Sequence, residues 1–216
     1  METQPDAPKG GAVGKQFDFL GPAQAADEIG RLGTYRVLKA LGAGGMGVVF
    51  LAEDTLLERQ VALKVMLPSI AADESARLRF MREAKTAAAI SHDHIVRIYQ
   101  VGEDRGVPFI AMELLEGQAL DQRLKGREPL PLKQVVRIGK ETALGLAAAH
   151  KRGLVHRDIK PANLWLETLP TSPSQGGDEG GYRVKILDFG LARAMGGEQA
   201  TITQSGTIMG VLTSEK

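Results

Sequence analysis

The residue types best suited to chemistry lie in one short string and in a tripeptide downstream of it. Residues 156–163 read His-Arg-Asp-Ile-Lys-Pro-Ala-Asn, and residues 188–190 read Asp-Phe-Gly. The carboxylate of Asp158 can accept the proton of an attacking hydroxyl group. The side chains of Asn163 and Asp188 carry oxygen atoms that can hold Mg²⁺ against phosphate oxygens. These groups therefore predict a site for phosphoryl transfer from a triphosphate.

A glycine-rich stretch upstream predicts a second part of such a site. Residues 41–49 read Leu-Gly-Ala-Gly-Gly-Met-Gly-Val-Val, with a G-x-G-x-x-G frame at positions 42, 44 and 47. Glycines let backbone N–H groups approach phosphates closely. A dinucleotide-binding fold uses the same frame but begins a helix there, whereas the apolar run 48–51 predicts a hairpin between two strands. A glycine-rich turn without a ligand remains the alternative for this motif alone.

A lysine and a glutamate are predicted to meet inside the protein. The strand-like run 60–66 carries a single charge, at Lys64. Residues 73–90 have helical periodicity, with an apolar stripe formed by Ala76, Phe80, Ala87 and Ile90. Glu83 falls inside this stripe, and because a carboxylate facing a core is costly unless paired, we expect it to pair with Lys64. The alternative is that Glu83 turns outward and Lys64 is solvated.

The order of these motifs resembles that of a protein kinase catalytic domain, and the resemblance extends over residues 35–210. Lys160 followed by proline is similar to the serine/threonine-specific branch of bacterial type. The resemblance implies an α+β, protein-kinase-like bilobal fold. Its small lobe would be an antiparallel sheet of five strands with one important helix, and its helical large lobe would be incomplete. The implied reaction transfers the γ-phosphoryl group of ATP, with Mg²⁺ as cofactor, to serine or threonine hydroxyls of proteins.

The resemblance also implies a role for each part of the catalytic string. Asp158 would orient and deprotonate the acceptor hydroxyl, and Lys160 would steady the transferring phosphoryl group. Asn163 and Asp188 would be the metal ligands. Arg157 would grip a phosphate on the activation loop.

The implied nucleotide cleft draws on several segments. Lys64, held by Glu83, would contact the α- and β-phosphates. Met112 would be the gatekeeper beside the adenine, and backbone groups of Glu113 and Leu115 would bond the adenine edge. The other residues implied in ATP binding are Leu41, Gly42, Ala43, Gly44, Gly45, Met46, Gly47, Val48, Val49, Ala62 and Trp165.

Two features depart from the kinase pattern. Trp165 stands where the family has an aliphatic residue beneath the adenine, and its indole would either stack on the base or crowd it. Val211 stands where the family has a threonine that helps position the substrate hydroxyl, and the sequence beyond it does not continue the pattern. We therefore expect a kinase domain truncated after the activation loop and impaired in transfer. The alternative function is a non-catalytic remnant that binds only nucleotide or a partner protein.

The chain is predicted to divide into three parts. Residues 1–33, rich in Pro, Gly, Ala and Gln, predict a flexible leader. The small lobe would span 34–115 and the partial large lobe 116–216, with an inserted loop at 167–181 and an activation loop at 188–210. The strand-like segments on either side of the inserted loop are expected to pair, because the entropy of loop closure grows only slowly with length.

The activation loop carries hydroxyl groups that are candidates for modification. Counting back from residue 210, Thr203 and Ser205 occupy the positions most similar to the phosphorylated sites of bacterial kinases. The alternative is that both are ordinary residues of a polar tail.

Composition narrows the class of protein further. Hydrophobic residues make up 43% of the chain and charged residues 25%, which is typical of a globular protein. The net charge of +1 gives no case for binding nucleic acid or an anionic membrane. Without cysteine there is no disulfide, zinc–thiolate site or thiol nucleophile. No signal peptide and no run of 18 apolar residues is visible, so we expect a cytoplasmic protein with no membrane segment, whose partners are ATP and protein substrates.

Overall fold

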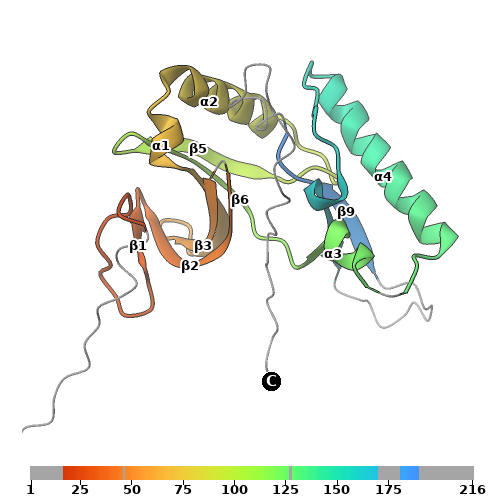
Figure 1. The fold of residues 1–216 in the computed structure, drawn as a ribbon, viewed down its shortest axis with the longest axis horizontal. Coiled ribbons are helices and arrows are strands. Elements are labelled where there is room, and N and C mark those ends of the chain that lie inside the picture. The colour runs from red at the N-terminus through yellow and green to blue at the C-terminus, as the bar shows by residue number, and fades with distance from the viewer. Residues whose placement is uncertain (1–16, 46, 127, 170–180, 190–216) are drawn as a thin grey trace, which may run out of the picture.

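A six-stranded antiparallel sheet forms the N-terminal half of the molecule (Figure 1). The computed structural model describes residues 17–45, 47–126, 128–169 and 181–189. Neighbouring strands follow the order β1-β2-β3-β4-β6-β5. Their bounds are Gly30–Leu32 (β1), Tyr35–Gly44 (β2), Gly47–Asp54 (β3), Arg59–Met66 (β4), Ile98–Asp104 (β5) and Val107–Glu113 (β6). β-Branched and aromatic side chains suit such a pleated surface, and the core of the sheet includes Val37, Phe50, Val61, Leu63, Val65 and Phe109.

Helix α2 (Glu74–Ala88) packs its apolar stripe against this sheet. Asp73 caps its N-terminus by accepting hydrogen bonds from the backbone N–H groups of Ser75 (2.8 Å) and Ala76 (3.1 Å). Ile90, just beyond the helix, is also buried. The predicted helix and its stripe are confirmed, and the buried helical residues are Ala76, Phe80, Ala84 and Ala87.

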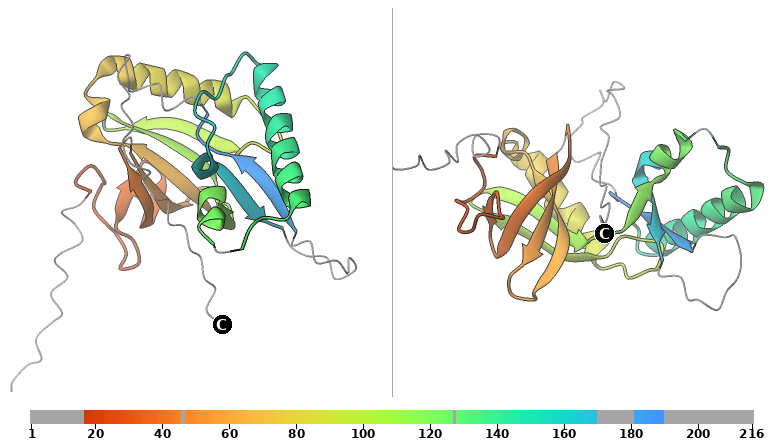
Figure 2. Two further views of the ribbon diagram at one scale, coloured as in Figure 1. Left: turned by 45° about the vertical axis from the view of Figure 1, so that its right-hand side comes forward. Right: turned by 90° about the horizontal axis from the view of Figure 1, so that it is seen from below.

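A smaller three-stranded antiparallel sheet and a long helix form the C-terminal part, and α4 runs beside this sheet in both views of Figure 2. The strands are Gly117–Ala119 (β7), Leu164–Thr168 (β8) and Tyr182–Ile186 (β9). The helices not yet described are Pro68–Ala71 (α1), Leu120–Leu124 (α3), Leu132–His150 (α4) and the 3₁₀ turn Pro161–Asn163 (η1). The predicted pairing across the inserted loop is confirmed, although β8 includes two residues, Glu167 and Thr168, that were predicted to lie in that loop.

Helix α4 lies close against β9 because it has a glycine at the contact. A Cβ atom at Gly145 would lie 2.7 Å from Cδ1 of Ile186 and 2.9 Å from the carbonyl oxygen of His94. Glu141 on the same helix accepts the backbone N–H of Val184 (2.8 Å). The helix thus supports the strand that leads to the Asp-Phe-Gly tripeptide. None of the described helices is long and apolar enough to cross a membrane.

The folded small lobe begins earlier than the sequence predicted. Leu20 is buried in the core of the six-stranded sheet, and the ring of Phe17 meets that of Phe50 edge-on at a centroid distance of 4.9 Å. The prediction of a flexible leader is therefore wrong for residues 17–33, because a short apolar island inside a polar stretch finds a place in the core. Residues 1–16 lie outside the described residues.

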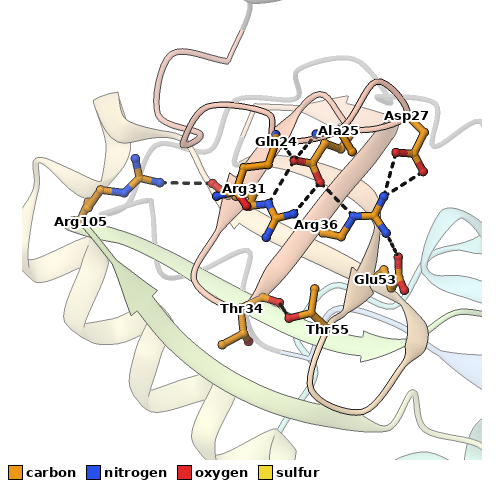
Figure 3. A network of polar contacts seen from close by, with 10 residues as sticks. Gln24, Ala25, Asp27, Arg31, Thr34, Arg36, Glu53, Thr55 and Arg105 are labelled. Atoms are coloured by element: carbon orange, nitrogen blue, oxygen red, sulfur yellow. Dashed lines mark hydrogen bonds and ion pairs between the residues drawn. The ribbon is translucent and has the colours of Figure 1, made fainter.

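A buried carboxylate ties this added segment to β2 (Figure 3). The side chain of Glu28 is fully buried and accepts hydrogen bonds from Nε of Arg31 (3.1 Å) and Nε of Arg36 (2.9 Å). The backbone N–H groups of Gln24 and Ala25 also donate to it. The bond from Arg31 above all, with those from Gln24 and Arg36, lowers the pKa of Glu28 to about 2, although burial alone would raise it. Strand β1 is thereby held as a sixth strand where five were predicted.

Replacing Leu20 by alanine tests the packing of the N-terminal segment. The change should lower the free energy of unfolding by about 2–5 kcal/mol, because it removes buried methyl groups and leaves a cavity. Leu57→Ala is the matched control, since Leu57 is 61% exposed, and it should cost less than about 0.5 kcal/mol. Urea denaturation measures both values, and equal effects would contradict the packing described here.

The pH dependence of stability tests the buried carboxylate. The pKa of Glu28 is about 2 in the folded protein against 4.5 for an unperturbed carboxyl group. The ionised group therefore contributes stability that is fully present above about pH 4.5 and is lost as the pH falls towards 2. Glu28→Gln should be less stable than the wild type at pH 7, with a difference that shrinks below pH 4.5 in thermal melts. A difference that stays constant down to pH 2 would show that the charge of Glu28 does not matter.

Candidate active site

The side chains of the catalytic string meet on one tight turn. The turn η1 brings Asn163 back towards Asp158, and its Nδ2 donates to the backbone oxygen (2.8 Å) and to Oδ2 (3.1 Å) of Asp158. Nζ of Lys160 lies 2.9 Å from the same Oδ2. Proline at the first position of η1 suits the turn, because its fixed φ matches a helical start. The structure thus brings these three predicted site residues together.

A buried histidine joins this turn to the Asp-Phe-Gly tripeptide. Nδ1 of His156 accepts the backbone N–H of Asp158 (3.3 Å), so that Nε2 carries the proton and donates to the carbonyl oxygen of Leu187 (2.7 Å). The imidazole also meets the ring of Phe189 edge-on at 4.8 Å. The backbone N–H of Leu187 in turn donates to the backbone carbonyl oxygen of Asn163 (2.9 Å). No role for His156 was predicted from the sequence, and in the structure its imidazole links the two loops.

The buried ammonium of Lys64 pairs with Asp188 and not with Glu83. Nζ of Lys64 lies 2.6 Å from Oδ1 of Asp188, and only 8% of Lys64 is exposed. The predicted ion pair between Lys64 and Glu83 is therefore wrong for this structure. Glu83 is half-buried, with Oε2 shielded from solvent, as its place in the helical stripe predicted. Asp188 has a φ of 56°, and this turn after β9 places its carboxylate where the buried ammonium needs a counter-charge.

The predicted metal ligands form a donor set that fits a magnesium–nucleotide complex. The side chain of Asn163 donates both of its hydrogen bonds to Asp158 through Nδ2. Its amide oxygen can therefore serve as a metal ligand together with the carboxylate of Asp188. Mg²⁺ commonly takes one or two protein ligands and completes its shell with phosphate oxygens and water. The described residues contain no cluster of three or more His, Asp or Glu side chains that would hold a metal by itself.

The glycine-rich stretch forms the predicted hairpin, between β2 and β3. Gly44 pairs with Gly47, and a Cβ atom at Gly47 would lie 2.2 Å from the carbonyl oxygen of Val65. A Cβ atom at Gly44 or Gly45 would meet nothing within 4 Å, so the backbone near the tip is open to a ligand. Met46 lies outside the described residues. The remaining predicted contacts on β2 are Leu41, Gly42 and Ala43.

Four predicted nucleotide-binding side chains share one face of the larger sheet. Val49 lies opposite Lys64, and Ala62 lies opposite Met112. Because side chains alternate along a strand, Ala62 and Lys64 point to the same side. Val48 points to the opposite side and is buried in the core. Val48, which was also predicted to bind the nucleotide, can therefore contact it only through its backbone.

The hinge segment, residues 113–117, connects the two sheets and is held by side chains that the sequence analysis did not assign. Oε1 of Glu113 accepts the backbone N–H of Arg97 (2.8 Å) and lies 2.6 Å from Nζ of Lys185. The backbone N–H of Glu113 donates to the backbone oxygen of Arg97 (3.0 Å), so this N–H is already engaged. Leu115, the second predicted adenine contact, is half-buried in the same segment. The only feature of the sequence that could have indicated this contact is Lys185, a lysine inside an apolar run.

Trp165 lies on β8 and reaches the end of the hinge segment. Its Nε1 donates to the carbonyl oxygen of Glu116 (3.1 Å). The residue is buried. Of the predicted regulatory residues, Arg157 is exposed with a φ of 65°, while Thr203 and Ser205 lie outside the described residues.

Comparisons with known proteins agree with this arrangement. The family model described as the protein kinase domain matches residues 35–209. Serine/threonine-protein kinase PrkC of Bacillus subtilis is 35% identical over 178 residues, and serine/threonine-protein kinase PknJ of Mycobacterium tuberculosis is 41% identical over 178 residues. Each match covers 82% of this chain but only 25% and 28% of these relatives, so the chain spans about a quarter of their length. The solved kinase domain of M. tuberculosis PknI has a TM-score of 0.64 and 35% identity, over 78% of this chain and 64% of that chain.

Alanine substitutions in the glycine hairpin test its packing. Gly47→Ala should lower stability by about 1–3 kcal/mol, because the added methyl group overlaps the backbone of β4. Gly44→Ala is the matched control, since a Cβ atom there meets nothing within 4 Å. Thermal melts of the two variants measure the difference, and a Gly47→Ala protein as stable as Gly44→Ala would contradict the close approach of β3 to β4.

Proposed function

This chain belongs to the protein kinase family, and we propose that its cleft binds Mg·ATP and transfers the γ-phosphoryl group to serine or threonine hydroxyls of proteins. The observation that carries the proposal is the meeting of Asp158, Lys160 and Asn163 on one turn that is hydrogen-bonded to the segment bearing Asp188. This turn supplies a base, an ammonium group and a metal ligand, and Asp188 supplies the second ligand. The names of the relatives, serine/threonine-protein kinases, support the acceptor class.

In the proposed reaction, the acceptor hydroxyl oxygen attacks the γ-phosphorus, the bond from phosphorus to the bridging oxygen breaks, and ADP leaves with that electron pair. Asp158 takes the hydroxyl proton. Lys160, 2.9 Å from this carboxylate, is placed to balance negative charge on the transferring group. Bound Mg²⁺ would neutralise charge between the phosphates, with Asn163 and Asp188 as its ligands.

The ion pair between Lys64 and Asp188 competes with the binding of Mg·ATP. Oδ1 of Asp188 is engaged by the ammonium group in this structure, so a phosphate that takes this ammonium group, or a metal ion that takes this oxygen, replaces one partner of the pair. The exchange conserves charge pairing, because a phosphate replaces the carboxylate and a metal ion replaces the ammonium group. We therefore expect ATP and Mg²⁺ to favour each other's binding.

A second candidate function is the binding of a nucleotide or a partner protein without transfer. One observation favours it: α4 carries apolar side chains at exposed positions, and exposed apolar patches often mark interaction sites. These residues are Leu132, Val135, Val136 and Leu144.

Labelled ATP and purified protein distinguish the two functions. Asp158→Asn should reduce phosphoryl transfer at least about 100-fold, because it removes the base, while calorimetry should find Mg·ATP affinity nearly unchanged. Asp188→Asn should remove the Mg²⁺ dependence of ATP binding. Asp93→Asn is the matched control, because the side chain of Asp93 is 84% exposed, and it should leave transfer unchanged.

The acceptor sites are identified by mass spectrometry on the same samples, with autophosphorylation at Thr203 or Ser205 as the expected product. Transfer of equal rate in Asp158→Asn and wild type would overturn the catalytic assignment. Mg²⁺-dependent ATP binding without any transfer would favour the second candidate. Failure of the wild type to bind ATP would reject the nucleotide site itself.

A further inference from the structure

Trp165 departs from the kinase pattern, and its position on β8 brings it to the hinge segment. Its strand neighbours Leu164 and Leu166 are buried in the core that includes residues of α4. Since side chains alternate along a strand, the indole lies on the opposite face. Lys185, its cross-strand partner on β9, shares that face and reaches Glu113. The indole therefore lies on the side of the smaller sheet that meets the hinge segment.

The end of the hinge segment holds the indole in one orientation. Nε1 of Trp165 donates to the carbonyl oxygen of Glu116 (3.1 Å), and only 6% of the residue is exposed. The same carbonyl accepts the backbone N–H of Thr168 (3.1 Å). A Cβ atom at Gly117 would lie 2.1 Å from the oxygen of Leu166, so the backbone is pressed onto β8 at this point. A ring that is buried and bonded in this way does not crowd an open cleft.

The start of the hinge segment is held by Lys185, the residue of β9 that pairs with Trp165. Lys185 is 4% exposed, and its Nζ lies 2.6 Å from Oε1 of Glu113. Trp165 and Lys185 are directly opposite each other on β8 and β9. A single cross-strand pair thus holds both Glu113 and Glu116, on either side of the backbone that would meet the adenine.

We propose that Trp165 is a positioning residue for recognition of the nucleotide base. The inference rests on the proposed function, in which backbone groups of Glu113 and Leu115 bond the adenine edge. By holding the carbonyl of Glu116, the indole orients the backbone one residue beyond Leu115 before a nucleotide arrives. A backbone segment that is already oriented loses less conformational entropy when the nucleotide binds. Such a segment also rejects a base whose donors and acceptors do not match its own. Trp165 thus affects the relative affinity for different bases and not the binding of the phosphates.

An indole that only filled the core would behave differently. Its loss would weaken the binding of every nucleotide by the same factor, because the whole cleft would loosen. Loss of a positioning bond weakens adenine binding more than guanine binding, since guanine presents an acceptor and a donor where adenine presents a donor and an acceptor. The ratio of the two affinities therefore separates the positioning role from the structural one.

Intrinsic fluorescence gives a direct test, because the chain contains a single tryptophan. Mg·ADP should change the intensity or the wavelength of the emission of Trp165, since the indole bonds the segment that meets the base. Mg·tripolyphosphate, which carries no base, should leave the emission unchanged. This measurement uses the wild-type chain and does not depend on the folding of any variant.

Calorimetry with ADP and GDP gives the second test. Trp165→Phe keeps an aromatic ring and removes the N–H donor, and the ratio of the GDP to the ADP dissociation constant should fall about two- to tenfold, the effect of one hydrogen bond. Glu167→Gln is the matched control: Glu167 lies on the same strand as Trp165, its substitution weakens an ion pair with Arg183 on β9, and the ratio should stay unchanged.

The outcomes separate this inference from the proposed function. If calorimetry detects ADP binding but the emission does not change, the positioning role is overturned and the nucleotide site stands. Equal losses of ADP and GDP affinity in Trp165→Phe would also overturn it and would assign the indole to the core. If the wild type binds no ADP in calorimetry, the proposed function fails and this inference falls with it.

Discussion

A buried ammonium group needs a counter-charge, and two buried lysines of this molecule find theirs across the boundary between the two sheets. Lys64 of the larger sheet pairs with Asp188 beyond β9, and Lys185 of β9 pairs with Glu113 at the end of β6. Separating either pair without a substitute would leave a charge in a poorly solvated interior, which is strongly unfavourable. In one pair the lysine belongs to the larger sheet, and in the other it belongs to the smaller sheet. Together the two pairs fix the positions of β9 and of the hinge segment relative to each other.

The turn that carries Asp158, Lys160 and Asn163 depends on the same strand. Helix α4 approaches β9 closely through Gly145, and the residue after β9, Leu187, bonds both His156 and Asn163. The position of Asp158 therefore depends on the packing of β9 against α4. Because these contacts join rigid elements, a small displacement of β9 would move Asp158, Asn163 and Asp188 together.

The sequence predicted local elements better than it predicted side-chain pairings. The hairpin of the glycine-rich stretch and the helix that carries Glu83 follow from local rules of alternation and periodicity, and the structure confirms both. The partner of Lys64 was misassigned because Glu83 and Asp188 both satisfy the argument from burial, and a sequence carries no distance that decides between them. Similarly, residues 17–33 show neither helical nor strand periodicity and follow a stretch rich in Gly and Pro, and only the finished sheet offers the site in which Leu20 becomes buried.

The position of β1 also bears on where this unit can be cut. The recognisable kinase pattern starts at residue 35, but β1 covers the outer edge of β2, and Glu28 neutralises the charge of Arg36 there. A recombinant fragment cut at residue 35 would expose an unpaired strand edge, and such edges recruit strands from other molecules. Self-association of that fragment would then be a property of the cut and not of the protein, so boundaries taken from similarity alone are unsafe for this chain.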